Sequence, residues 1–268
     1  MSTPTEVTAA EAKACCAAAY STDAVAMILG ESYHPGGLAL TRHLVGLLGL
    51  QPGQRVLDVA SGPGSTALLL AREHDVHVDG VDLGALAVAK AGAAAAEQGL
   101  DQLVTFHVGD AERLPFDDAS FDAVICECAF CTFPDKPTAA AELARVLKPG
   151  GRLCLSDVTI ATGGLPEELA GLAGWVACLA DARPLGEYAA ILADAGLQTV
   201  TSQAHDNALA TMVERIGARL VAFRMLADTP GLGGVDFPRA LELTAQAARA
   251  VSDGIAGYGL LVAGKPGP

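Results

Sequence analysis

Hydrophobic and polar positions follow a repeating order along the middle of this chain. Between residues 54 and 158, short apolar runs of strand length alternate with longer stretches of helical character. The strand candidates are RVLDVA (55–60), VHVDGVD (76–82), LVTFHVGD (103–110), FDAVICE (121–127) and GRLCLSDV (151–158). The helical stretches lie near 64–74, 84–98 and 136–147. This alternation predicts an α/β fold, a doubly wound and mostly parallel sheet with helices on both faces.

The flanking regions add helices and two more strands. The first 50 residues are expected to be helical and to end at a turn over 51–53. Further helices are predicted near 166–181, 185–195 and 206–252, the last with breaks around Pro230 and Pro238. LQTVTSQ (197–203) and GYGLLVAGK (257–265) complete a predicted seven-stranded sheet. We expect a helical N-terminal lid (1–50), a core (51–205), and C-terminal helices with a closing strand (206–268) in the same domain.

Composition narrows the function classes. Hydrophobic residues make up 51% of the 268 residues, enough for one sizeable core, and the net charge of −14 with no basic run argues against nucleic acid as a partner. The N-terminus lacks a secretory pattern, and no apolar run reaches the roughly 18 residues of a membrane span. We therefore expect a cytoplasmic protein without a membrane partner. Seven cysteines in a reducing compartment favour metal binding or chemistry over disulfides.

A glycine-rich turn follows the first strand candidate. VLDVASGPG (56–64) runs from a strand into a turn and then a helix, a geometry that lets backbone approach a ligand. Asp58 could organise this turn or meet a ligand ammonium. Asp82 ends the second strand about 20 residues later, where an acid suits the hydroxyls of a ribose. GDAERLPF places Asp110 and Ala111 at the end of the third strand, where an adenine could lie.

These motifs, with FDAVIC and LKPGG, resemble the class I S-adenosylmethionine-dependent methyltransferases over about 55–160. The resemblance implies a Rossmann-like core and S-adenosylmethionine as cofactor, with the glycine turn by its methionine part, Asp82 on its ribose and the third strand's end beside adenine. A dinucleotide site is less favoured, since Ala67 occupies the place of the third glycine of its motif. The predicted cofactor-binding residues are Asp58, Ala60, Ser61, Gly62, Gly64, Asp82, Leu83, Asp110, Ala111 and Glu127.

The hexapeptide CECAFC (126–131) places three thiols beyond the fourth strand, at the edge where open α/β sheets bind ligands. Structural zinc needs about four ligands, usually from paired knuckles, and stays an alternative. Packing in the hydrophobic core is a second alternative, since cysteine often behaves as a small hydrophobe. We predict core packing for Cys154, and it is an alternative for Cys178. Cys15 and Cys16 point about 100° apart on a helix, so one of them is expected to face a site.

A narrower resemblance concerns the cysteines. AKACC, CECAFCTFPDK and VACLADARPLGEY are similar to the cysteine-bearing segments of arsenite methyltransferases. The resemblance implies that Cys16 (or Cys15), Cys128 and Cys178 bind trivalent arsenic as the substrate. It also implies arsenite or its thiol adduct as the small-molecule partner, together with an external thiol reductant.

Elementary chemistry agrees with this assignment. Trivalent arsenic is soft and prefers thiolates, by the rule that governs soft metals. Three thiolates leave its lone pair able to attack a sulfonium methyl in line, so the nucleophile needs no general base, and positioning provides most of the catalysis. Lys136 is a candidate cation for stabilising thiolates. Glu127 is expected to contact cofactor or backbone, and Tyr33 and His34 either line the cofactor pocket or belong to a loop.

Other functions remain open at the level of sequence. A methyltransferase acting on carbon, oxygen or nitrogen of a small organic molecule would have cysteines that merely line the cavity. A selenium or tellurium methyltransferase would share the same logic. A third class is a metalloid sensor or sequestering protein that keeps the cofactor cradle without turnover.

Overall fold

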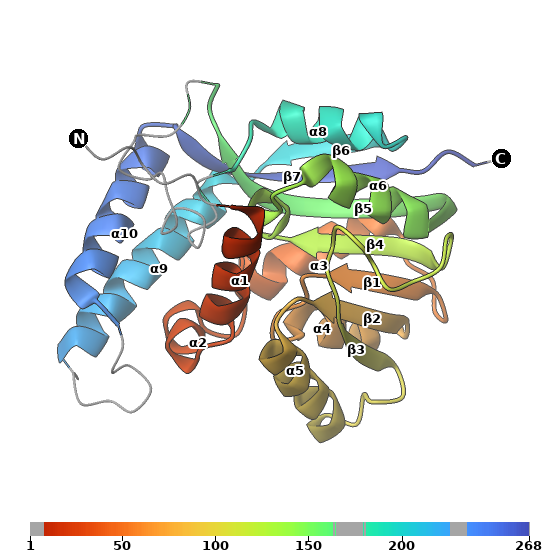
Figure 1. Cartoon of the computed structure of the whole chain (residues 1–268), viewed down its shortest axis with the longest axis horizontal. Coiled ribbons are helices and arrows are strands. Elements are labelled where there is room, and N and C mark those ends of the chain that lie inside the picture. Colours follow the sequence, from red (N-terminus) through yellow and green to blue (C-terminus); the bar gives the residue numbers. More distant parts are fainter. Residues whose placement is uncertain (1–7, 163, 165–178, 180, 226–234, 268) are drawn as a thin grey trace.

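The computed structural model, which describes residues 8–162, 164, 179, 181–225 and 235–267, confirms the α/β prediction (Figure 1). A seven-stranded sheet has the order β3-β2-β1-β4-β5-β7-β6, and β7 runs antiparallel to β5 and β6. The strands are β1 (Arg55–Val59), β2 (His77–Asp82), β3 (Val104–Val108), β4 (Phe121–Glu127), β5 (Leu147–Ile160), β6 (Gln198–Ala204) and β7 (Ala256–Gly264). The helices are α1 (Ala9–Tyr20), α2 (Asp23–Leu29), α3 (Gly37–Leu48), α4 (Ser65–His74), α5 (Ala85–Glu97), η1 (Phe130–Thr132), α6 (Lys136–Val146), α8 (Leu185–Asp194), α9 (Asp206–Met225) and α10 (Phe237–Ser252).

Alternate residues of the central strands build two hydrophobic cores. Leu57 and Val59 of β1 face one core, which α6 and α8 cover, whereas Val56 faces the other, which α3, α4 and α5 cover. Central parallel strands are buried on both faces, which agrees with the short apolar runs seen in the sequence. The carboxyl ends of β1 to β4 therefore meet at one edge between the two helical layers.

Element boundaries follow local signals. α6 begins at Lys136 as predicted, because the Asp135 carboxylate caps it by accepting from the Thr138 N–H at 3.0 Å. β5 is longer than the predicted 151–158, since it also pairs through the LKPGG turn. The predicted helical region 206–252 is two helices, α9 and α10. The helix expected over 166–181 lies mainly outside the described residues.

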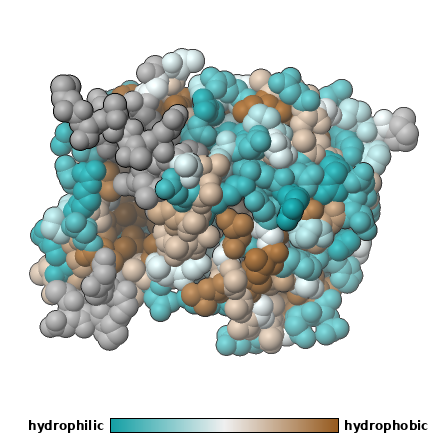
Figure 2. Space-filling model, in the orientation of Figure 1, coloured by the Kyte–Doolittle hydropathy of each residue, from teal (hydrophilic) through white to brown (hydrophobic). Residues whose placement is uncertain are grey.

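The N-terminal helices pack beside the ends of β2 and β3. Lys90 of α5 bonds to Asp23 of α2 at 2.7 Å, and a side chain at Gly84 would approach Ser21 Oγ to 2.8 Å. Apolar residues gather on the surface where α1, α2 and α5 lie next to one another (Figure 2).

Within the described ranges, no single helix is long and apolar enough to cross a membrane, although α1 and α2 pass that test together as a pair bent by 72°. The division into lid, core and C-terminal part stays an expectation.

Candidate functional site

A pocket of about 150 Å³ opens at the carboxyl ends of β1 to β4, between α1 and the segment preceding α3. It is lined by nine of the ten residues that the sequence assigned to the cofactor, all except Gly64. Parts of the wall that sequence reasoning missed are Lys13, Ala17, Tyr20, Ser32, Thr66, Thr132 and Phe133. These residues lack a local motif, so the fold alone brings them to the pocket.

The glycine turn after β1 has the backbone geometry of a ligand cradle. Ala60, Gly62 and Gly64 have φ angles of 57°, 51° and 82°, in the left-handed region that favours glycine. A side chain at Gly64 would also lie 2.6 Å from the ring of Phe106. Gly64 is therefore required both by its own conformation and by packing where α4 begins.

Asp58 supplies a buried carboxylate to the pocket. Burial, followed by the negative charges of Glu127 and Asp82, raises its pKa well above the ordinary value. Its Oδ2 atom and the hydroxyl of Ser61 are buried without a hydrogen-bond partner in the described part of the chain. Such orphaned acceptors are rare in folded proteins. They fit a bound ligand that brings an ammonium group, as the amino-acid part of S-adenosylmethionine does.

Asp82 links the two loops that flank the pocket. Its Oδ2 accepts from the Gly62 N–H at 2.9 Å, and its Oδ1 accepts from the Gly84 N–H at 2.7 Å. Burial raises the pKa of Asp82, while the two backbone hydrogen bonds oppose that shift. A carboxylate oxygen can accept more than one hydrogen bond, so the residue fits the ribose hydroxyls expected at this strand end.

Lys13 of α1 reaches the end of β3. Its ammonium bonds to Asp110 at 2.8 Å and to Glu112 at 2.5 Å. Burial opposes the charge of Lys13, but the bonds to these two carboxylates prevail and raise its pKa. This contact fastens the N-terminal helix across the end of the pocket that Ala111 lines.

Glu127 faces the pocket from the end of β4. Its carboxylate accepts from Thr66 Oγ1 at 2.7 Å and from Thr41 Oγ1 at 3.1 Å, and His34 Nδ1 lies 3.7 Å away. Tyr33 and His34 both line the pocket, and His34 is buried. Hydroxyl groups thus hold Glu127 in one orientation, in agreement with a binding role.

The hexapeptide CECAFC divides between the pocket and the core. Cys128 lines the pocket, whereas Cys126 and Cys131 are buried in the hydrophobic core beside β4. Burial raises the pKa of Cys126 well above the ordinary value, which disfavours its thiolate. Cys128 has φ = 53°, and its N–H donates to Ser156 O at 2.7 Å. A left-handed cysteine at a strand end is the kind of strained residue that gathers at functional sites.

The other described cysteines also differ in whether they line the pocket. Cys16 of α1 lines the pocket, and its neighbour Cys15 is not among the lining residues. Cys154 is buried against Leu44, as the core interpretation expects. Cys178 lies outside the described residues. Among the residues that the structure describes, no three His, Cys, Asp or Glu side chains are grouped to hold a metal ion.

Lys136 does not belong to the pocket wall. Its buried ammonium bonds instead to Asp181 and to two backbone carbonyls behind the loop after β4. The role of Lys136 in stabilising thiolates stays a prediction.

Sequence comparisons place this site in a known family. Residues 57–155 match the family model described as a methyltransferase domain. Methyltransferase GfsG of Streptomyces halstedii is 32% identical over 86% of this chain and 81% of its own length. The 27-O-demethylrifamycin SV methyltransferase of Amycolatopsis mediterranei is 35% identical, with 61% of each chain covered. An arsenite methyltransferase of Halobacterium salinarum is 34% identical over 56% of this chain, and the match spans 39% of that relative.

Solved structures agree on the fold. A Haemonchus contortus phosphoethanolamine N-methyltransferase in complex with S-adenosyl-L-methionine is 21% identical with a TM-score of 0.77, covering 97% of this chain and 57% of its own. The [4+2]-cyclase SpnF is 27% identical with a TM-score of 0.71, covering 86% and 81%. The strand-end carboxylates, the glycine cradle and the relative that matches most of both chains lead to one conclusion. The chain belongs to the class I S-adenosylmethionine-dependent methyltransferases, and its cofactor is S-adenosylmethionine.

Proposed function

We propose that this enzyme transfers a methyl group from S-adenosylmethionine to trivalent arsenic bound by cysteine thiolates. The observation that carries the proposal is that Cys16 and Cys128, far apart in sequence, line the same pocket as the cofactor-binding carboxylates. Soft arsenic selects thiolates over the oxygen ligands that surround them. The 34% identity to an arsenite methyltransferase supports the same substrate.

In this proposal, one end of the pocket binds the cofactor and the other end binds the arsenic. The cofactor supplies an electrophilic methyl group on a sulfonium. Asp58, Asp82 and Asp110 hold the cofactor, and Cys16 and Cys128 hold the arsenic with its lone pair directed at that methyl. Cys178 is proposed as the third thiolate. Arsenic binding releases the thiol protons beforehand, so the transfer itself needs no general base.

A second candidate is methyl transfer to a small organic molecule, in which the thiols only line the cavity. A relative named for an organic acceptor, the 27-O-demethylrifamycin SV methyltransferase, favours it. Phe133, Tyr20 and Tyr33 give the pocket aromatic walls that would suit an apolar acceptor.

Methylation of arsenite by the purified enzyme, with speciation of the products, separates these functions. We expect methylated arsenic from the wild type and a loss on the order of 100-fold in turnover for Cys16→Ser and for Cys128→Ser. Cys15→Ser is the matched control, because it removes the adjacent thiol that does not line the pocket. Wild-type activity in Cys16→Ser and Cys128→Ser would refute the thiolate site. Tight arsenite binding without methyl transfer would indicate a sequestering protein instead.

A further inference from the structure

The loop after β4 forms the acceptor side of the pocket. Cys128, Ala129, Thr132 and Phe133 line the cavity, and the short helix η1 gives the loop its shape. The opposite side of the loop, including Cys131, is buried in the core. The position of this wall therefore depends on what holds its backbone from behind.

Asp157 of β5 holds one point of the loop. It is fully buried, and its Oδ2 accepts from the Cys131 N–H at 2.8 Å while its Oδ1 accepts from the Val158 N–H at 2.7 Å. Hydrogen bonds to a buried charge are stronger than neutral ones. Asp157 thereby fixes η1 to the sheet.

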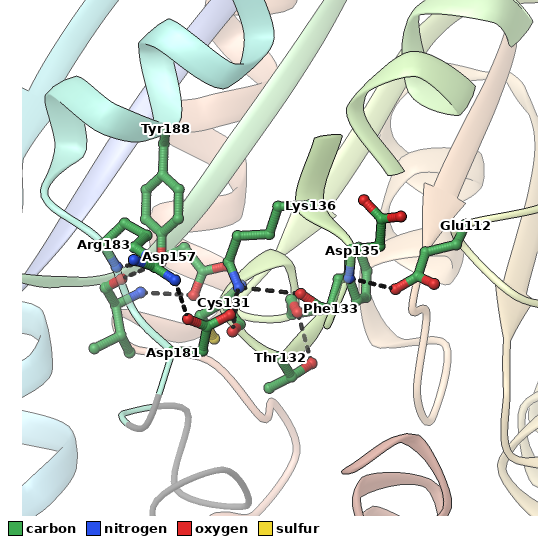
Figure 3. A network of polar contacts seen from close by, with 12 residues as sticks. Glu112, Cys131, Thr132, Phe133, Asp135, Lys136, Asp157, Asp181, Arg183 and Tyr188 are labelled. Atoms are coloured by element: carbon green, nitrogen blue, oxygen red, sulfur yellow. Dashed lines mark hydrogen bonds and ion pairs between the residues drawn. The ribbon is translucent and has the colours of Figure 1, made fainter. Parts of the chain in front are cut away.

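Lys136 holds two further points. Its ammonium donates to Cys131 O at 2.9 Å, to Phe133 O at 3.1 Å and to Asp181 Oδ2 at 2.6 Å (Figure 3). Burial removes the Lys136 ammonium from water, which disfavours its charge. Lys136 also stands in the first turn of α6, where the positive end of the helix dipole disfavours a cation. Local helix preferences thus do not account for this lysine, whereas its bonds to the loop do.

Asp181 supplies the opposite charge from outside the pocket wall. Its Oδ1 accepts from the Arg183 guanidinium, and the Arg183 N–H donates to Tyr188 Oη at 3.0 Å. Tyr188, buried on α8, donates in turn to Val158 O at 3.1 Å. A continuous path of polar contacts therefore runs from α8 through Asp181 and Lys136 to the carbonyls of the loop (Figure 3).

We propose that Asp181 is a positioning residue for methyl transfer. Its carboxylate fixes the Lys136 ammonium, which fixes the loop that carries Cys128, so the acceptor is held in line with the methyl group. The nature of the acceptor rests on the proposed function, but the positioning role does not. Asp58, Asp82 and Asp110 lie at or beyond the ends of β1, β2 and β3, and Glu127 at the end of β4 is held by Thr41 and Thr66, so this role predicts a defect mainly on the acceptor side.

Alkylation of the native enzyme by iodoacetamide, quantified cysteine by cysteine by mass spectrometry, tests the positioning directly. Cys131 is 1% exposed and reports movement of the loop, whereas Cys154 is buried beside α3 and reports global unfolding. In Asp181→Asn we expect Cys131 to be alkylated at least 10-fold faster while Cys154 stays at the wild-type rate. Affinity for S-adenosylhomocysteine should stay within twofold. Asp181→Glu, which keeps the carboxylate, should restore the wild-type pattern.

Asp118→Asn is the matched control, because Asp118 is the exposed partner of Arg145 and lies in another ion pair. With arsenite as acceptor, Asp181→Asn should lower kcat/KM for arsenite at least 10-fold without changing the KM for the cofactor. Equal increases at Cys131 and Cys154 would mean that Asp181 only stabilises the fold, and an unchanged Cys131 would also overturn the proposal. If the wild type does not methylate arsenite, the proposed function fails. The alkylation rates of Cys131 and Cys154, together with the affinity for S-adenosylhomocysteine, still decide the role of Asp181.

Discussion

Carboxylates at the ends of β1, β2 and β3 line one end of the pocket, whereas thiols and aromatic rings from α1 and from the loop after β4 line the other. Asp82 at the cofactor end accepts hydrogen bonds from the backbone of its own and the neighbouring turn. At the acceptor end, Cys128 depends on a loop that buried ions hold from behind. The two ends thus differ in what keeps them in place.

This difference indicates which end can change most easily in evolution. The cofactor end follows from strand order and two turns, which every protein of this fold shares. The acceptor end is built from a helix and a loop whose positions depend on a few side chains. A relative named for rifamycin and a relative named for arsenite match this chain at 35% and 34% identity, which agrees with one fold serving different acceptors.

The largest effect is expected from Gly64, where the cofactor end depends on backbone geometry. Gly64→Ala places a β-carbon at φ = 82° and 2.6 Å from Phe106, so it should lower the free energy of unfolding by about 3 kcal/mol. Gly92→Ala is the control, because that glycine lies inside α5 with open space around it, and it should raise stability by about 0.5–1 kcal/mol. Urea unfolding measures both, and equal effects would show that the turn is not constrained.

Substitution of Asp82 tests whether the cofactor end and the acceptor end of the pocket are independent. Asp82→Ala removes the acceptor for the Gly62 and Gly84 amides, so affinity for S-adenosylhomocysteine should fall about 100-fold, about 2.7 kcal/mol, by calorimetry. The alkylation rate of Cys128 should stay within about twofold, since Cys128 is held by other contacts. A large change at Cys128 would contradict the separation of the two ends.

Asp58 should give a smaller effect with a characteristic pH dependence. Its folded-state pKa is raised by burial, so its contribution to stability is present below the ordinary value of 3.8 and is lost as pH rises through the folded-state pKa. Asp58→Asn should remove this loss and stabilise the ligand-free enzyme by about 1–2 kcal/mol at pH 8, with little change near pH 4.

The same substitution should weaken S-adenosylhomocysteine binding about tenfold, because the ligand ammonium loses a charged partner. Urea unfolding at both pH values and calorimetry at pH 8 provide the measurements. A variant less stable than the wild type at pH 8 would show that Asp58 is paired in the ligand-free enzyme.

The structure brings most of the residues predicted to bind the cofactor into one pocket, for a physical reason. Asp58 lies within the first apolar run, Asp82 ends the second and Asp110 follows the third, and parallel strands bring their carboxyl ends to one edge. The fold, the seven strands and the start of α6 at Lys136 follow from the same local patterns.

The acceptor end is less predictable because its geometry is not periodic. Cys126 faces the core since side chains alternate along β4, but the left-handed turn at Cys128 and the burial of Cys131 depend on η1 and on Asp157. The role of Lys136 was missed for the same reason: its partner Asp181 is distant in sequence, and residue spacing cannot show such a contact.

The smallest effect should come from Lys13, which joins the two ends by fastening α1 to Asp110 and Glu112. Lys13→Gln keeps a long polar side chain, one atom shorter, and removes the charge, so it should weaken S-adenosylhomocysteine binding about threefold, since partly exposed ion pairs contribute about 0.2–1 kcal/mol. Binding to the wild type should weaken with added salt, because screening acts on the same ion pairs, and the variant should show a smaller salt dependence. Calorimetry between low and high ionic strength, with Lys90→Gln as the control on α5, measures the difference. Because Lys90 holds α2 through Asp23 at 2.7 Å and touches α1 at the carbonyl of its C-cap Ser21, 3.3 Å away, the control should lose less affinity than Lys13→Gln, and an equal loss would show that the helices close over the cofactor as one unit.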